Sequence, residues 1–263
     1  MTQHAAIIDT SAGIDLPQLK PGLPEDIAWL EHDLRALVRP AAFLRSQSAP
    51  KGQTPTSAPP GSTRAWGSGP DVPVDAPWAP AHTLQSLQRQ WAESPYDGLS
   101  FVMQLNLEEI PTSIRARMAS HCPAVGIVWV FIDLTENWKG VAHFDPRPAA
   151  SIAWHPPGAP AAPAAAQWTL SDTLPFATEE TIPAIAANWD NLGEMYDDWI
   201  QDHYRAPSDV QIGGWTAPIQ GDHDEAQKTF VCALTQLSFG DSGAVYLHYN
   251  NESGRFFVLV ETC

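Results

Sequence analysis

Carboxylates are the residues of this sequence most able to do chemistry, and they gather in two places. Acidic and aromatic side chains are interspersed through residues 188–204, and a shorter acidic run occupies residues 222–225. Two carboxylates that face a common cleft can act as acid and base in glycoside cleavage. An acidic face with aromatic anchors can instead bind a basic protein. The candidate partner-binding residues are Asp190, Glu194, Asp197, Asp198, Trp199, Asp202, Asp222, Asp224 and Glu225.

Residues 188–204 have the spacing of an amphipathic helix. The acids fall on one face, and large apolar side chains recur every three or four residues on another, as Trp189, Leu192, Tyr196 and Trp199. Such a pattern is most often a solvated face opposite a packed one. The same acids in a cleft would favour a hydrolase, which we keep as the alternative function.

A second motif resembles the chymotrypsin-like serine proteases. Residues 240–243 read Gly-Asp-Ser-Gly, the nucleophile tetrapeptide of that family, and residues 119–122 resemble its general-base motif. However, His121 follows a predicted helix, and residues 240–243 lie between two predicted strands, where Gly-Asp-Ser-Gly is ordinary turn chemistry. Only 21 residues follow Ser242, too few for the strands and helix of a specificity pocket. We predict a hairpin here and no catalytic residues.

Metal and cofactor motifs are equally weak. Asp and His can bind a divalent ion, but the spacing of residues 222–225 fits neither an EF-hand nor a zincin motif. The sequence has no P-loop and no Gly-x-Gly-x-x-Gly fingerprint. We therefore predict no metal site and no cofactor.

The overall charge narrows the class of partner. Thirty acidic and 14 basic side chains give a formal net charge of −16, which repels nucleic acid and anionic lipid and attracts basic proteins. Acidity can also serve solubility alone. The three cysteines form no CxxC pair, and no stretch reaches the roughly 18 apolar residues of a membrane helix. Residues 1–13 lack a basic start followed by a long apolar run, so we expect no signal peptide. We expect a cytoplasmic protein that binds neither nucleic acid nor membrane.

Both helices and strands are predicted to position these residues. We therefore expect an α+β fold, with duplicated antiparallel units forming packed sheets, peripheral helices and long Pro-rich loops. The predicted order is an N-terminal helical segment (1–45), a Pro/Gly/Ser-rich loop (46–80) and an α+β domain (81–263), folded as one unit. Helices are predicted at 24–38, 82–92 and 182–204, a helical turn at 113–120, and strands at 99–107, 125–134, 229–237, 244–249 and 255–260.

Two strand pairs resemble each other, which predicts an internal duplication. Residues 101–105 (FVMQL) align with 230–234 (FVCAL), and residues 126–129 (GIVW) align with 243–246 (GAVY). In both copies a glycine precedes the second strand. A repeated strand–connection–strand unit implies two antiparallel sheets packed together.

Three blocks of the sequence resemble the YwqG-like family, a bacterial domain family of unknown function. They are residues 99–111 (LSFVMQLNLEEIP), 212–222 (IGGWTAPIQGD) and 239–246 (FGDSGAVY). The chain departs from the family pattern at Thr216, where a proline is usual, and at residues 65–73 and 122–126. The resemblance implies a cytoplasmic α+β domain of duplicated antiparallel units and supplies no catalytic residues.

The resemblance also suggests a function. YwqG-like proteins tend to accompany secreted polymorphic toxins. The resemblance therefore implies an immunity protein that neutralises a cationic toxin or secretion-system effector in bacterial competition. Nucleases are one such class of toxin, because they must be basic to bind phosphates. The hydrolase described above and a structural or regulatory scaffold remain the alternatives.

Overall fold

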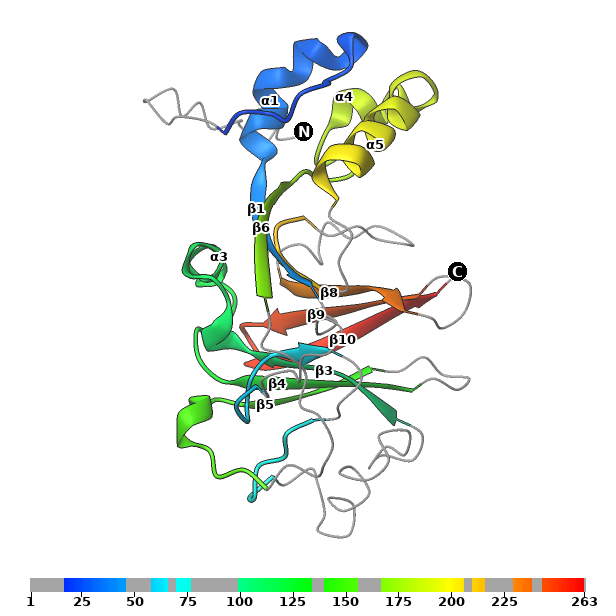
Figure 1. Ribbon diagram of the computed structural model, residues 1–263. Helices are drawn as coiled ribbons and strands as arrows, with labels where there is room; N and C mark the ends of the chain where they lie inside the picture. The colour runs from blue at the N-terminus through cyan, green and yellow to red at the C-terminus, as the bar shows by residue number, and fades with distance from the viewer. Residues whose placement is uncertain are drawn as a thin grey trace, which may run out of the picture.

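The computed structural model shows two antiparallel sheets with a layer of helices at one end (Figure 1). This arrangement confirms the predicted α+β class. The residues that the structure describes are 17–45, 58–65, 70–76, 99–133, 140–155, 167–205, 210–215, 229–237 and 243–262. The predicted helix at 82–92, most of the Pro-rich loop and the acidic run 222–225 lie outside these ranges.

The smaller sheet has four strands in the order β2-β3-β4-β5. These are β2 (Arg64–Ala65), β3 (Leu99–Asn106), β4 (Ile127–Asp133) and β5 (Gly140–Asp145). The 3-10 helix η2 (Leu107–Glu109) and helix α3 (Thr112–Met118) connect β3 to β4, and the 3-10 turn η3 (Ala149–Ser151) follows β5. Strand β4 is buried on both faces, which explains why it reads as a continuous apolar run.

The larger sheet has six strands in the order β10-β9-β8-β7-β1-β6. These are β1 (Arg39–Arg45), β6 (Gln167–Thr173), β7 (Val210–Gly213), β8 (Phe230–Leu237), β9 (Gly243–Asn250) and β10 (Arg255–Thr262). Strands β1, β6 and β7 were not predicted. Their sequences carry a proline, alternate with polar residues or are only four residues long, so the apolar strand signal is weak.

The two sheets have the predicted internal duplication. Met103 pairs with Val130 in the small sheet, and the aligned Cys232 pairs with Leu247 in the large sheet. The bulges match as well, because the register shifts across Val102 in β3 and across the aligned Val231 in β8. A β-bulge is a specific irregularity, so its recurrence at aligned positions is strong support for two copies of one unit.

The main core lies between the sheets. Alternate residues of β4, including Val128 and Val130, point into this core together with Leu234 and Val245 from the large sheet. The edges of the sheets also approach closely, since a Cβ on Gly140 of β5 would lie 2.2 Å from Cγ1 of Val258 in β10. Each fully buried aliphatic side chain contributes roughly 1.5–3 kcal/mol, so this core is the main source of stability.

The helical layer has its own core. It comprises the 3-10 helix η1 (Glu25–Leu30) and helices α1 (Glu31–Leu37), α4 (Pro183–Ala186) and α5 (Trp189–Tyr204). The two helices predicted at 24–38 and 182–204 are therefore each divided. The first changes from 3-10 to α geometry at Leu30, and the second breaks at Asn188, whose φ of −128° is not helical. Figure 1 shows β1 and β6 rising together from the sheet to this layer.

A buried polar network holds residues 58–65 and 70–76 against the rest of the small sheet. Oε1 of Gln104 accepts hydrogen bonds from the Asp71 backbone N–H (2.9 Å) and from Nε1 of Trp129 (2.9 Å). Its amide nitrogen donates to the Ser62 carbonyl (2.8 Å) and to the Asp71 carboxylate (3.0 Å). The same carboxylate pairs with Arg64 at 2.6 Å, so Gln104 is the centre of a largely satisfied network.

Gln104→Leu should therefore destabilise the fold by about 2–4 kcal/mol, because it leaves buried donors and acceptors unpaired. Urea unfolding monitored by circular dichroism measures the loss. Gln201→Leu, an exposed glutamine on α5, is the control and should change stability by no more than about 0.5 kcal/mol. A loss below about 1 kcal/mol for Gln104→Leu would contradict a central role for this network.

Candidate functional site

The structure places the predicted site residues in three different settings. Asp190, Glu194, Asp198 and Asp202 are exposed on α5, as an acidic docking face requires. Asp222, Asp224 and Glu225 lie outside the described residues. Trp199 and Asp197 differ from the prediction, for separate physical reasons.

Trp199 is buried and is not available to a partner. Only 4% of its surface is exposed, and it packs against Tyr196 and Tyr204 in the core of the helical layer. Its indole nitrogen lies 3.5 Å from the Pro21 carbonyl. The part of α5 that carries Tyr196 and Trp199 is therefore packed, and Trp199 stabilises the helical layer.

Asp197 is half-buried on α5. Its Oδ1 atom is buried and has no hydrogen-bond partner in the described part of the chain. Burial raises the pKa of this carboxyl to about 6, although nearby Arg205 lowers the pKa in part. Arg205 is itself fixed, donating to the carbonyls of Trp215 (3.2 Å) and Leu174 (3.1 Å). Asp197 is thus held beside an internal arginine rather than presented on the surface.

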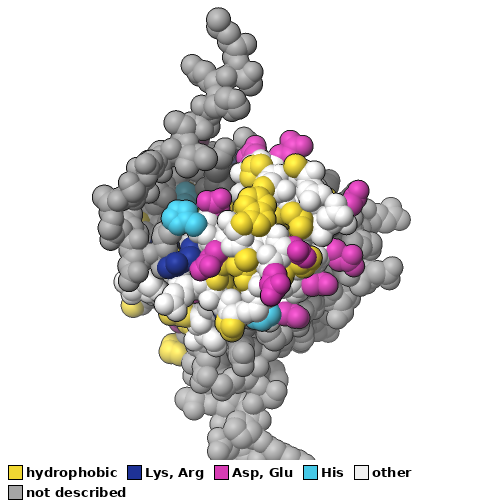
Figure 2. Space-filling model, turned by 90° about the horizontal axis from the view of Figure 1, so that it is seen from above, with side chains coloured by type: hydrophobic (Ala, Val, Ile, Leu, Met, Phe, Trp, Pro, Cys, Tyr) yellow, Lys and Arg dark blue, Asp and Glu magenta, His cyan; other side chains and the backbone are white. Residues whose placement is uncertain are grey.

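The helical layer has an exposed aromatic centre. Trp29 and Trp189 are 65% and 44% exposed, and Figure 2 shows apolar side chains gathered on this face with acidic ones around them. The indole ring of Trp189 packs closely over Gly193 one turn later, where a Cβ would lie 2.3 Å from the ring. Residues 17–38 and 174–205 hold eleven acidic and three basic side chains, a net charge of −8, half that of the chain.

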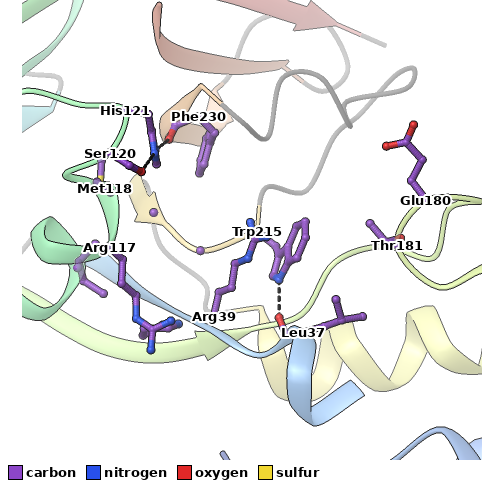
Figure 3. Close-up of a pocket in the computed structure, with 14 residues that line it drawn as sticks. Leu37, Arg39, Arg117, Met118, Ser120, His121, Glu180, Thr181, Trp215 and Phe230 are labelled. Atoms are coloured by element: carbon purple, nitrogen blue, oxygen red, sulfur yellow. Dashed lines mark hydrogen bonds between the residues drawn. The ribbon is translucent and has the colours of Figure 1, made fainter. Parts of the chain in front are cut away.

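A cleft of about 590 Å³ lies where the helical layer meets the large sheet and α3 (Figure 3). Sequence reasoning did not predict it, because its residues come from elements that are far apart in the chain. Its walls combine cationic, hydroxyl and apolar side chains: Leu37, Arg39, Pro40, Ile114, Arg117, Met118, Ser120, His121, Glu180, Thr181, Gly213, Gly214, Trp215 and Phe230.

Trp215 is rigidly fixed at the base of this cleft. Two consecutive glycines precede it, Gly213 (φ 64°) and Gly214 (φ 71°), and this left-handed bend brings the chain against β1. The Trp215 N–H then donates to Oγ1 of Thr173 (2.9 Å), and its indole N–H donates to the Leu37 carbonyl (2.6 Å). The Gly-Gly-Trp motif of the sequence therefore builds one wall of the cleft.

Two arginines lie on the same side of the cleft. The guanidinium of Arg39 is 3.4 Å from the centre of the Trp215 ring, which is a cation–π contact. Partial burial lowers the pKa of Arg39, and repulsion by Arg117 lowers it further, so the two guanidiniums are close enough to interact. Both remain charged at neutral pH.

The positions of His121 and Gly243 do not support the resemblance to a serine protease. Nε2 of His121 is 3.3 Å from the carbonyl of Phe230, at the beginning of β8. Gly243, the described residue of the Gly-Asp-Ser-Gly motif, pairs with Leu237 at the other end of that strand. Seven residues of extended chain span roughly 23 Å, so His121 is far from Gly243.

The hydrolase alternative requires two carboxylates facing one cleft. Of the described acids, Glu180 alone lines the cleft, and the exposed acids of α5 lie on the outer surface of the helical layer. Within the described ranges no group of three His, Cys, Asp or Glu side chains is placed to hold a metal ion. The geometry thus brings together cations and hydroxyls, not paired carboxylates.

The raised pKa of Asp197 predicts a pH-dependent stability. An ordinary Asp has a pKa near 3.9, so between about pH 4 and pH 6 the folded protein holds a proton that the unfolded chain has lost. Stability therefore falls as the pH rises through this window. Asp197→Asn should raise the free energy of unfolding at pH 7 by about 1 kcal/mol, allowing for solvent screening, and should change it little near pH 4.

Urea titrations of both proteins at pH 4, 5, 6 and 7 measure the difference. Asp202→Asn, which alters an exposed acid on the same helix, serves as the control and should leave the pH profile unchanged. An Asp197→Asn profile parallel to that of the natural chain would contradict the assignment.

The Gly-Gly bend gives a second prediction. A Cβ on Gly214 would lie 2.4 Å from Oγ1 of Thr173 and 2.8 Å from Cβ of Ala41. Gly214→Ala should thus cost roughly 3 kcal/mol from backbone strain and overpacking together. Gly254→Ala is the matched control, because Gly254 has a similar φ of 64° but open space around it, and should cost only about 1 kcal/mol. Equal losses in thermal unfolding would show that the contacts of Gly214 are unimportant.

Comparison with known proteins gives a family without a function. None of the curated proteins compared with the chain matches it. In the described part of the chain, no helix has the length and apolar character needed to span a membrane. A family model described as "Domain of unknown function (DUF1963)" matches residues 63–253, which is well over half of the chain. The chain therefore belongs to the DUF1963 family.

Proposed function

We propose that this protein is a non-enzymatic binding protein whose acidic helical layer captures a basic partner. The observation that carries the proposal is the layer itself, an exposed aromatic centre surrounded by acids. We further propose that the partner is a cationic toxin or effector and that the protein acts as its immunity protein in the cytoplasm. This second step rests on the resemblance to YwqG-like proteins described above.

The charge distribution supports a basic protein partner. The helical layer carries −8, and its few cations have partners: Arg35 lies 3.9 Å from Glu31, and Arg205 is bound to backbone carbonyls. An acidic surface of this kind accelerates association with a cationic protein and repels nucleic acid.

The exposed tryptophans support a specific contact rather than diffuse attraction. Tryptophan is enriched among residues that dominate binding energy at protein interfaces. Trp189 lies flat over Gly193, and the indole N–H of Trp29 donates to the Asp26 carbonyl at 3.0 Å. Because both rings are already ordered, little conformational entropy is lost when a partner covers them.

The test uses the product of the gene directly upstream as a defined probe. A toxin-domain gene at that position, whose purified product forms a stoichiometric complex with this chain at low and moderate salt, would support the proposal. A metabolic operon, or a toxin that does not bind at either salt concentration, would overturn it.

A matched pair of charge reversals locates the interface. Glu194→Lys on α5 should slow association with that toxin by about 3–10-fold at low salt, and by less at high salt, because it reverses an exposed steering charge of the helical layer. Glu252→Lys makes the same change at an exposed position in the β9–β10 turn, outside the layer, and should have a smaller effect. Equal slowing, measured by surface plasmon resonance, would place the interface away from α5.

A further inference from the structure

The cleft between the helical layer and the large sheet is cationic in a strongly acidic protein. Arg39 and Arg117 both line it, and within the described residues neither guanidinium forms an ion pair or a hydrogen bond. Several other described arginines have such partners, as Arg64 has Asp71 and Arg147 has Asp75 and Asp145. With 30 acids available to 14 bases, two adjacent guanidiniums without a carboxylate are a specific arrangement.

A purely structural role accounts for one of these arginines only. Arg39 covers the ring of Trp215 and so contributes to packing. Arg117 is exposed at the end of α3, makes no described contact that stabilises the fold, and repels Arg39. Like charges held close together cost free energy, and a bound anion relieves that cost. Glu180, the one described acid of the cleft, forms no ion pair with either arginine, and Figure 3 shows it on the opposite side.

The surroundings of the arginines are suited to a small ligand. Trp215 is fixed by hydrogen bonds from its backbone and indole N–H groups, so Arg39 rests on a rigid support. His121 and Ser120 add polar groups to the same wall, with their side chains 3.3 Å apart. A volume of about 590 Å³ is in the range that encloses a metabolite-sized molecule.

We propose that this cleft binds a small molecule through an oxyanion, either a phosphoryl or a carboxylate group, held by Arg39 and Arg117. Planar guanidiniums bind such groups with paired, charge-assisted hydrogen bonds. This site is distinct from the acidic face of α5, so it goes beyond the proposed function and can succeed or fail independently of it.

The experiment is isothermal titration calorimetry of the full chain with three defined probes, inorganic phosphate, pyrophosphate and succinate, at constant ionic strength. The first two report a phosphoryl preference and the third a carboxylate preference. We expect saturable binding of at least one probe. Arg117→Gln should weaken it by about tenfold or more, because a charge-assisted contact is lost, and Arg39→Gln should do the same.

Arg115→Gln is the matched control. Arg115 is on the same helix and loses the same charge, but it lies outside the cleft and donates to the Glu108 carbonyl at 3.1 Å. Binding that survives Arg115→Gln and is lost in Arg117→Gln would support the site. The absence of saturable binding for all three probes up to about 10 mM, or an equal loss in both variants, would overturn it. Glu194→Lys should leave this binding unchanged, which separates it from the test of the proposed function.

Discussion

The position of strand β1 is the constraint on which the rest of the structure depends. It pairs with β6 on one side and with β7 on the other, and only Val38 separates it from α1 of the helical layer. Residues 41–44 are all buried, so both faces of the strand are packed. A slip of one residue would exchange the side chains that fill these two faces, so the register is strongly specified. Because Arg39 is its first residue, the same strand joins the sheet to the helical layer and places a guanidinium over Trp215.

Charge is separated between the two regions that β1 connects. The helical layer holds half of the net negative charge, most of it on exposed acids, and the cleft beneath it holds two arginines without carboxylate partners among the described residues. If the acids of the helical layer could reach the arginines of the cleft, the two would form ion pairs and their charges would cancel. The hydrogen bonds of Trp215 and Arg205 hold the arginine wall of the cleft and helix α5 in fixed positions.

Sequence reasoning succeeded where a signal is local and repeated. The aligned apolar runs predicted both the strand pairs and their duplication, and the matching bulges at Val102 and Val231 confirm it. It failed where burial depends on distant elements. Trp199 has the spacing of a surface anchor, yet residues 17–38 cover it, and nothing in α5 alone indicates this. The cleft was missed for the same reason, since Arg39, Arg117 and Trp215 meet only after three separate elements pack together.

The family model matches only part of the cleft and only part of the helical layer. It spans residues 63–253, so it includes Arg117, the Gly-Gly-Trp bend and α5, but it excludes Arg39, Trp29 and all of β1. One half of the cleft and one half of the acidic layer therefore come from the matched domain, and the other halves come from the segment that precedes it. The shared domain supplies a rigid wall with one arginine and one helix with acids. The preceding segment completes the cation pair and the aromatic centre, so both proposed binding sites include residues outside the shared domain.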